Sequence, residues 1–246
     1  DKILPLSALI GSTTDGEIKD GLVSTHKTVV SFTVFEKTTL KTHISNSFNS
    51  YFEAGSTLMN NLNEKNIKVI ISFIDGLQGN GDYFLNGIDS VNRDVIVAGG
   101  LAGDNANSQE TYVFTKDNIF KNGVVGLGLS SECLNVTTNY SFNWITVGVD
   151  LKITKAVGNR VYTINDKTAY EAYSYYLGEK TARALTAIGV EFPLIVKRNG
   201  INIARTVISS EIDGSLIFGG NLKEGDIVKF GYGDREWILD NVKQNV

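Results

Sequence analysis

The strongest constraint on the fold is an alternation of strands, glycine-containing loops and a helix in the first half of the chain. The apolar run Lys68–Ile74 leads into the loop Asp75–Gly81, and the residues after it predict an amphipathic helix over Asp82–Val91. A second apolar run, Val95–Ala98, ends in the loop Gly99–Asp104. A helix between two buried strands is typical of a crossover connection. We therefore expect the two strands to be parallel and their loops to emerge at one edge of a sheet.

The residues before this unit predict more strands. Leu6–Ile10 predicts a strand that ends in the polar loop Gly11–Glu17. The stretch Thr28–Phe35 is β-branched or aromatic at nearly every position, and Thr38–Ile44 has a similar composition. These two stretches predict a pair of antiparallel strands.

Helices are expected at four further places. Asn46 or Ser47 is expected to cap a helix that continues to Leu62. Asp166 is the expected N-cap of a helix that ends at Leu177. Two more helices are expected over Lys180–Ile188 and Asp234–Gln244. The runs that follow Asp104 predict hairpins and include Thr111–Thr115, Val124–Leu129, Leu134–Phe142, Leu151–Val157 and Arg160–Ile164.

These elements predict an α+β fold, or a mixed α/β fold, built from two closely packed portions. Each portion is expected to hold a mixed, mostly antiparallel sheet with helices on one face. The chain contains 25 glycines and only two prolines, so its turns depend on Gly, Asn and Asp and no proline-rich linker divides it.

Composition and charge exclude several classes of function. The 246 residues include 23 Lys and Arg against 27 Asp and Glu, so a surface that tracks nucleic acid has no electrostatic basis. The single cysteine, Cys133, excludes an internal disulfide and a cysteine zinc site. No apolar run reaches 18 residues and no signal peptide is recognisable, which indicates a cytoplasmic chain without membrane insertion.

The residue types present disfavour several catalytic chemistries. A nucleophilic serine needs a nearby base, and only His26 and His43 are available, with no G-x-S-x-G motif. The acidic run from Asp15 to Asp20 is more typical of a solvated turn than of a metal site. An enzyme that uses an Asp or Glu base on a small metabolite stays open as an alternative.

The loop Gly76–Gly81 precedes a helix, where backbone N–H groups are able to receive an anion. It lacks the Lys-Ser/Thr pair of a phosphate-binding P-loop, and Asp75 and Asp82 flank it with negative charge. A neutral or zwitterionic ligand fits this loop better than a phosphate. A tight turn with no binding role is the equally weighted alternative.

Three polar loops are expected at the ends of buried strands, where ligands of open α/β sheets bind. The candidate ligand-binding residues of these loops are Ser12, Thr13, Thr14, Asp15, Glu17, Asp75, Asn80, Gly100 and Asp104. Tyr112 and Trp144 are candidates for an aromatic wall, although a tryptophan in a hairpin is more often a core residue. We rank Asp104 and Asp75 above Asp15 and Glu17, because nearby glycines let a ligand approach their backbone closely.

Several segments together resemble the FIST domain, a sensory module of bacterial signalling proteins. Residues 11–18, GSTTDGEI, are similar to the G-C-S-T-A-G-E-I segment of that family. Further similar segments follow in the family's order and include Asp75–Leu77, Ala98–Asp104, Thr111–Phe114, Gly123–Leu129, Ile153–Ala156 and Ala169–Tyr173.

The resemblance implies an N-terminal FIST portion over residues 1–164 and a C-terminal portion over residues 165–246. It implies a non-catalytic sensor whose ligand is an amino acid or related metabolite. The implied output partner is a histidine kinase, a diguanylate cyclase or a chemotaxis transducer. Two departures are expected: Ser12-Thr13-Thr14 lacks the family's cysteine, and the chain lacks both the strand and helix that usually precede this segment and the closing segment.

Some members of the family resemble haem-binding nitric oxide sensors, so haem is the alternative ligand to a metabolite. Axial ligation of haem iron would fall to His26, His43 or Cys133. Both histidines lie in or beside β-rich stretches, where a surface or hairpin role is the commoner explanation. We therefore expect no cofactor.

Overall fold

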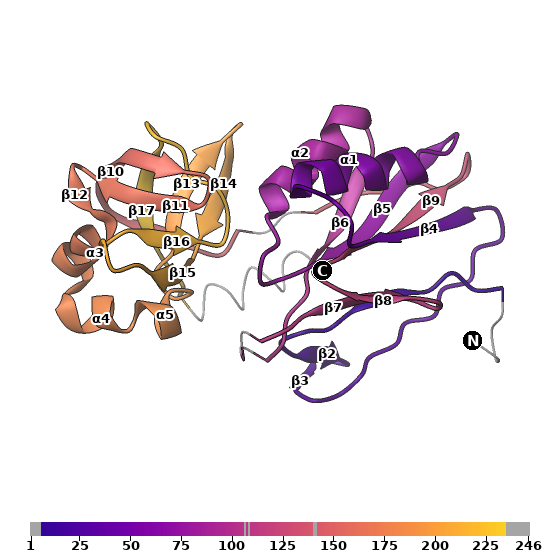
Figure 1. Cartoon of the computed structure of the whole chain (residues 1–246), viewed down its shortest axis with the longest axis horizontal. Coiled ribbons are helices and arrows are strands. Elements are labelled where there is room, and N and C mark those ends of the chain that lie inside the picture. The colour runs from indigo at the N-terminus through magenta and orange to yellow at the C-terminus, as the bar shows by residue number, and fades with distance from the viewer. Residues whose placement is uncertain (1–5, 106, 108, 140–141, 235–246) are drawn as a thin grey trace. The chain divides into compact units, whose positions relative to one another are not determined.

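A computed structural model describes residues 6–105, 107, 109–139 and 142–234. The chain divides into two compact units, Asp1–Thr137 and Thr138–Val246 (Figure 1). Each unit combines a mostly antiparallel sheet with a few helices, which confirms the predicted α+β class. The helix expected over Asp234–Gln244 lies outside the described residues, apart from its first residue.

The first unit is built on a four-stranded sheet with the order β4-β9-β5-β6. Its strands are β4 (Thr39–Ser45), β9 (Val124–Ser130), β5 (Ile67–Ile74) and β6 (Ile96–Leu101). β5 and β6 are parallel, and α2 (Gly81–Val91) connects them, so the predicted crossover is confirmed. β9 pairs antiparallel with both β4 and β5.

Helices α1 (Tyr51–Leu62) and α2 cover one face of this sheet (Figure 1). Their buried side chains meet Ile70, Ile74 and Val124 of the sheet in one apolar core. The two helices approach so closely that a Cβ on Gly55 would lie 2.0 Å from the carbonyl oxygen of Phe84. Ser50, and not Asn46 or Ser47, caps α1, because its side chain accepts a hydrogen bond from the Glu53 N–H.

The opposite face of the sheet is covered at one end by a second, three-stranded sheet with the order β1-β7-β8. Its strands are β1 (Ile10–Ser12), β7 (Tyr112–Thr115) and β8 (Ile119–Lys121). Val113 of this layer packs with Val125 and Phe73 of the first sheet. A separate hairpin joins β2 (Glu17–Lys19) to β3 (Leu22–Ser24).

Two sequence predictions for strands in this unit are wrong in their boundaries. Leu6–Ile10 is not a strand: β1 begins at Ile10, where the backbone starts to pair with β7, and Leu6 is exposed. β6 does not stop at Ala98 but continues to Leu101. Gly99 allows this continuation, because its φ is +144° and a Cβ there would lie 1.7 Å from the Ser72 carbonyl oxygen.

Two other β-rich runs form no strand. The sequence predicts that Thr28–Phe35 pairs with the strand Thr38–Ile44. That strand is β4, and it pairs with β9 instead. The described residues of Leu134–Phe142 contain no strand either. In both runs the side chains favour a strand, but no described strand lies beside them to complete the hydrogen bonds.

The second unit holds an eight-stranded sheet with the path β14-β13-β17-β10-β11-β16-β15, and β12 pairs with β11. Its strands are β10 (Ile145–Val157), β11 (Arg160–Ile164), β12 (Lys167–Thr168), β13 (Leu194–Arg198), β14 (Ile201–Arg205), β15 (Val207–Ser210), β16 (Leu216–Phe218) and β17 (Ile227–Tyr232).

This sheet curls on itself. β14 and β15 stand at opposite ends of its path, yet only Thr206 separates them along the chain. β10 contributes to both halves, because its first part pairs with β17 and its last part with β11, with bulges in its register. The curled sheet therefore encloses one apolar core in the manner of a small barrel.

Three short helices of this unit are α3 (Ala169–Leu177), α4 (Glu179–Arg183) and α5 (Leu185–Ile188). The N-cap of α3 is Thr168, which forms a capping box with Glu171. Asp166 is not the cap, because it lies at φ +63° in the turn between β11 and β12. The single helix expected over Lys180–Ile188 is divided into α4 and α5 at Ala184.

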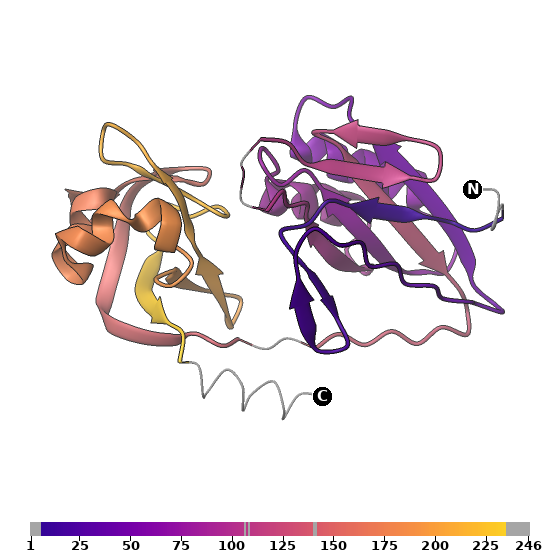
Figure 2. The same cartoon turned by 90° about the horizontal axis from the view of Figure 1, so that it is seen from below.

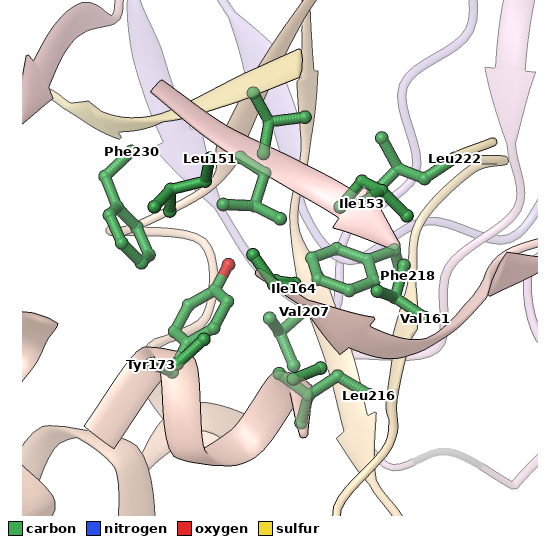
Figure 3. Close-up of a cluster of buried hydrophobic side chains, with 14 of the residues drawn as sticks. Leu151, Ile153, Val161, Ile164, Tyr173, Val207, Leu216, Phe218, Leu222 and Phe230 are labelled. Carbon is green, nitrogen blue, oxygen red and sulfur yellow. The ribbon is translucent and has the colours of Figure 1, made fainter. Parts of the chain in front are cut away.

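Tyr173 anchors α3 to the core of the second unit. Figure 3 shows its side chain reaching from the helix into the cluster that holds Ile164, Phe218 and Phe230. Its ring meets Phe230 edge-on with centroids 4.9 Å apart, and its hydroxyl donates to the Phe192 carbonyl at 3.2 Å. The polar end of this buried tyrosine is therefore satisfied. Burial raises the pKa of its phenol well above the ordinary value.

Candidate functional site

The candidate site lies at the edge of the first sheet where β4, β5 and β6 end. β4 and β5 both run antiparallel to β9, and β6 runs parallel to β5, so all three point in one direction. Their last residues, Ser45, Ile74 and Leu101, align with Val124 at the start of β9. The carboxyl ends of strands in such sheets are where ligands bind. We call this end of the sheet the carboxyl edge.

Asp75 organises the carboxyl edge. Its side chain is 1% exposed and directly follows β5. One carboxylate oxygen, Oδ2, accepts hydrogen bonds from the Gln78 N–H at 2.7 Å and the Tyr51 hydroxyl at 3.3 Å. The other, Oδ1, accepts a short hydrogen bond from the Thr111 hydroxyl. A buried carboxylate thus holds together the start of α1 and two loops.

Tyr51 serves this arrangement as a donor. Burial raises the pKa of its phenol, and the nearby charge of Asp75 and its hydrogen bond raise that pKa further. The phenol therefore stays protonated at physiological pH and keeps donating to Asp75. It has no capacity to act as a base at that pH.

The loops that follow β5 and β6 are packed against each other. The Gly76 N–H donates to Thr111 Oγ1 at 3.2 Å, and a Cβ on Gly76 would lie 1.6 Å from the Ala102 carbonyl oxygen. The Ala102 N–H donates to the Ile74 carbonyl at 2.8 Å. Only glycine fits at position 76, because the neighbouring backbone occupies the space of a side chain.

The loop that follows β1 joins the same group. The Thr13 N–H donates to the Tyr112 carbonyl, and the Tyr112 N–H donates to Thr13 Oγ1, both at 3.0 Å. The Gly103 N–H donates to the Thr13 carbonyl at 3.0 Å, and the Asp104 N–H donates to Asp15 Oδ1 at 2.9 Å. Three of the loops chosen from the sequence therefore lie together at one end of the unit.

Asp104 and Glu110 shape the loop after β6. Asp104 Oδ2 accepts hydrogen bonds from the Gln109 N–H at 2.7 Å and the Glu110 N–H at 3.3 Å. The Glu110 carboxylate forms an ion pair with Lys121 and accepts a hydrogen bond from the Tyr112 hydroxyl, and these contacts lower its pKa. The role of Asp104 and Asp75 as the leading ligand contacts stays a prediction.

The remaining candidates are placed as follows. The Thr14 hydroxyl donates to Glu17 Oε1 at 2.9 Å, and Glu17 Oε2 accepts from the Lys27 N–H at 3.2 Å. Asn80 is the N-cap of α2, since its side chain accepts from the Tyr83 N–H. Ser12 lies in β1 and Gly100 lies in β6. Trp144 lies in the second unit, and its ring is 5.8 Å from that of Phe142.

A hollow of about 260 Å³ opens at the carboxyl edge. Its lining residues are Asn46, Phe48, Asn49, Ser50, Tyr51, Gln78 and Asn122. We call this the edge hollow. Two of its lining residues, Tyr51 and Gln78, hydrogen-bond to Asp75, so the hollow and the buried carboxylate form one structure.

The edge hollow has a particular chemistry. None of its lining residues is charged. The side-chain amides of Asn46, Gln78 and Asn122 form no hydrogen bond within the described part of the chain, and each carries both a donor and an acceptor. The rings of Phe48 and Tyr51, 5.2 Å apart, supply an apolar contact. A small polar molecule with an apolar part suits this lining.

Sequence reasoning missed the amides that line the edge hollow. Asn46 directly follows β4 and so carried the same strand-end signal that selected Asp75, whereas Asn122 lies two residues before the amino end of β9. Gln78 lies inside the candidate loop Asp75–Gly81, but the sequence favoured the charged Asp75 and the capping residue Asn80 in that loop. The missing information was which of these loops face one another.

The residues considered as haem ligands, His26, His43 and Cys133, lie outside the edge hollow. His43 lies in β4 with a half-buried ring, and burial lowers the pKa of its imidazole. His26 and Cys133 are exposed. None of the three lines the edge hollow or a second hollow of about 270 Å³ beside Lys37 and Glu132. Within the described ranges, no cluster of three or more His, Cys, Asp or Glu side chains is placed to hold a metal ion.

A comparison with known families places the chain in one of them. The fold defines an α+β protein of two units with a loop-built edge on its first sheet. Family comparison matches the FIST N domain over residues 1–167 and the FIST C domain over residues 169–245. The chain therefore belongs to the FIST family, whose domains are sensory modules of signalling proteins. No curated protein and no solved structure matches it.

The family division and the structural division fall at different places. The FIST N match ends at residue 167, whereas the first compact unit ends at Thr137. The hairpin β10–β11 therefore belongs to the second unit, although its sequence belongs to the N-terminal family domain. The described helices are also all too short or too polar to cross a membrane.

Proposed function

We propose that this chain is a non-catalytic sensory domain that binds a small molecule, an amino acid or a related metabolite, in the edge hollow. The observation that carries the proposal is that two lining residues of this hollow, Tyr51 and Gln78, hydrogen-bond to Asp75. Asp75 also accepts from Thr111, so it connects the lining to the loop after β6. A volume of about 260 Å³ suits a ligand of amino-acid size.

The lining supports a zwitterionic ligand. Amide NH₂ groups of Asn46, Gln78 and Asn122 donate to a ligand carboxylate, and their carbonyl oxygens accept from a ligand ammonium group. Phe48 and Tyr51 contact the apolar part of the ligand. Binding therefore rests on hydrogen bonds from the amides to both charged groups of a zwitterion, its carboxylate and its ammonium group.

The hydrogen bonds of Asp75 support a sensory role over a catalytic one. Its two carboxylate oxygens accept hydrogen bonds from three protein donors, and these bonds connect α1 with two loops. A general base needs a carboxylate within reach of a substrate proton. The lining of the edge hollow contains no acidic residue.

The proposed output is a signalling partner. A ligand that contacts Tyr51 and Gln78 stabilises the two groups that bond to Asp75, and Asp75 is bonded in turn to Thr111. Ligand binding thus favours one arrangement of α1 and both loops. A cytoplasmic histidine kinase, diguanylate cyclase or chemotaxis transducer is the proposed reader of this arrangement.

Thermal shift of the purified chain against amino acids and related metabolites tests the proposal, followed by calorimetric titration of each hit. We expect a saturable shift without turnover. Gln78→Ala and Asn122→Ala should weaken binding, whereas the exposed amide Asn135, replaced by alanine, serves as the matched control. Equal loss in the control, or product formation from the ligand, contradicts the proposal.

A further inference from the structure

An exposed apolar segment connects β3 to β4. Figures 1 and 2 show the chain between these strands as an extended ribbon that belongs to no sheet. Its residues Thr28–Phe35, here called the strap, read TVVSFTVF. The exposed fractions are 45% for Val29, 59% for Val30, 74% for Phe32 and 91% for Val34. Such a row of exposed large apolar side chains marks an interaction surface.

The backbone of the strap pairs with no other part of the chain that the structure describes. None of its N–H or C=O groups hydrogen-bonds to another described residue. The ends of the segment are nevertheless fixed, because the Lys27 N–H donates to Glu17 at 3.2 Å and the Lys37 carbonyl accepts from the Ser131 hydroxyl at 2.7 Å. The strap is therefore an extended segment that is held at both ends and whose backbone groups bond to none of the described residues.

The composition of the strap is that of a strand that is normally covered. Exposed edge strands in natural proteins carry charges, prolines or bulges that prevent pairing with other chains. The strap has none of these over its eight residues, and the nearest charges are Lys27 at one end and Glu36, followed by Lys37, at the other. A partner strand would satisfy both the backbone groups and the apolar side chains.

The charges favour a second copy of the same strap in antiparallel orientation. Antiparallel pairing places the Lys27 end of each strap beside the Glu36 end of the other, whereas parallel pairing places like charges together. The preceding hairpin β2–β3 also carries exposed apolar side chains, namely Ile18, Leu22 and Val23. A twofold axis repeats this surface on both chains.

Symmetry restricts the register of the pairing. A twofold axis between two antiparallel strands passes through the sheet, so paired residues have numbers of the same parity and one residue pairs with itself. The centre of the strap allows Ser31 or Phe32 at the axis. With Phe32 at the axis, Lys27 would face Lys37 of the other copy, which is unfavourable. The charges therefore select Ser31.

We infer that two copies of this chain associate through their straps as an antiparallel, twofold strand pair centred on Ser31. In this register Val30 of each copy faces Phe32 of the other, and Val34 faces Thr28. The even-numbered side chains form an apolar face, and the backbone groups of both straps are paired.

Sedimentation velocity of the full chain over a range of concentrations tests the association. We expect a concentration-dependent dimer, and Val34→Lys should raise its dissociation constant by at least about tenfold, because it places two charges in the apolar face. Ile212→Lys is the matched control, since Ile212 is fully exposed in the second unit. A monomer at all concentrations overturns the proposal and would indicate that the strap pairs with a strand of another protein. A dimer unaffected by Val34→Lys also overturns it.

Disulfide trapping tests the register. In a Cys133→Ser background, Ser31→Cys brings two thiols face to face across the axis, at a Cβ separation of about 4.5–5.5 Å, close enough for a disulfide after a small shift. Val29→Cys pairs instead with Thr33 of the other copy and should cross-link far more slowly. Rapid cross-linking of Ser31→Cys supports the inference. Equal or preferential cross-linking of Val29→Cys overturns the proposed pairing.

Discussion

Thr111 donates its hydroxyl hydrogen to the buried carboxylate of Asp75, a residue 36 positions earlier in the chain. The same Thr111 oxygen accepts from the Gly76 N–H, so one hydroxyl joins the loop after β5 to the loop after β6. The carboxyl edge depends on this long-range pair, and its contribution to stability and binding is measurable.

Replacing Thr111 with valine removes the hydroxyl and retains the shape. Asp75 Oδ1 loses the donor described above while buried, so the free energy of unfolding should fall by about 1–3 kcal/mol. Thr111→Ser keeps the hydroxyl and should lose less. Thr137→Val, at an exposed position, is the control. Denaturant unfolding measures all three, and an unchanged midpoint for Thr111→Val contradicts the assigned role.

Gly76→Ala tests the close approach of the two loops. The added Cβ meets the Ala102 carbonyl oxygen, and relief requires backbone movement, so we expect a loss of about 1–3 kcal/mol in stability. Gly100→Ala is the matched control, because nothing lies within 4 Å of a Cβ at that position. Thermal unfolding that ranks the two variants equally would show that the loops are not in contact.

Asp104→Asn separates two roles of that residue. The carboxylate accepts from two backbone N–H groups of its own loop, so the variant should lower the melting temperature through loss of about 1–2 kcal/mol and leave ligand affinity within threefold. If Asp104 contacts the ligand instead, affinity should fall about 10- to 150-fold. Calorimetry beside thermal unfolding decides between the two roles.

The stability of the fold should depend on pH through His43. Its Nε2 is buried without a hydrogen-bond partner among the described residues, and burial, with a smaller effect of Lys41, lowers its pKa below the ordinary 6.5. The unfolded chain then binds more protons than the folded chain below pH 6.5, so stability falls as pH drops from 6.5 towards the folded pKa.

Denaturant unfolding between pH 7.5 and 5.5 measures this dependence. The slope from one proton is at most about 1.4 kcal/mol per pH unit, reduced here because the ring is partly exposed. His43→Gln should flatten the profile, whereas His26→Gln, at an exposed position, should retain it. A profile that His43→Gln leaves unchanged assigns the dependence to other groups.

The sequence predicted the crossover of β5, α2 and β6 because its information is local. Apolar periodicity identified the strands and the helix, and parallel pairing follows from the length of the connection. The strap was mispredicted for the opposite reason. Side chains from Thr28 to Phe35 favour a strand, but a strand also requires a neighbour, and composition does not reveal whether one is present.

The candidate site was predictable in part. The strand-end rule selected Asp75 and the loops around it. It did not reveal that Asp75 bonds to Thr111 and Tyr51, because these contacts join residues far apart in the chain. Nor did it identify Asn46 and Asn122, which became neighbours of Gln78 only when β4 and β9 paired beside β5.

The glycines between α1 and α2 have a mechanical consequence. Gly55 lies against the Phe84 carbonyl and Gly87 against the Phe52 carbonyl, so the two helices touch through their backbones instead of through flexible side chains. Backbones in direct contact have no rotamers with which to absorb a shift, and packed interiors transmit strain. A displacement of Tyr51 at the first turn of α1 is therefore expected to move α1 and α2 together.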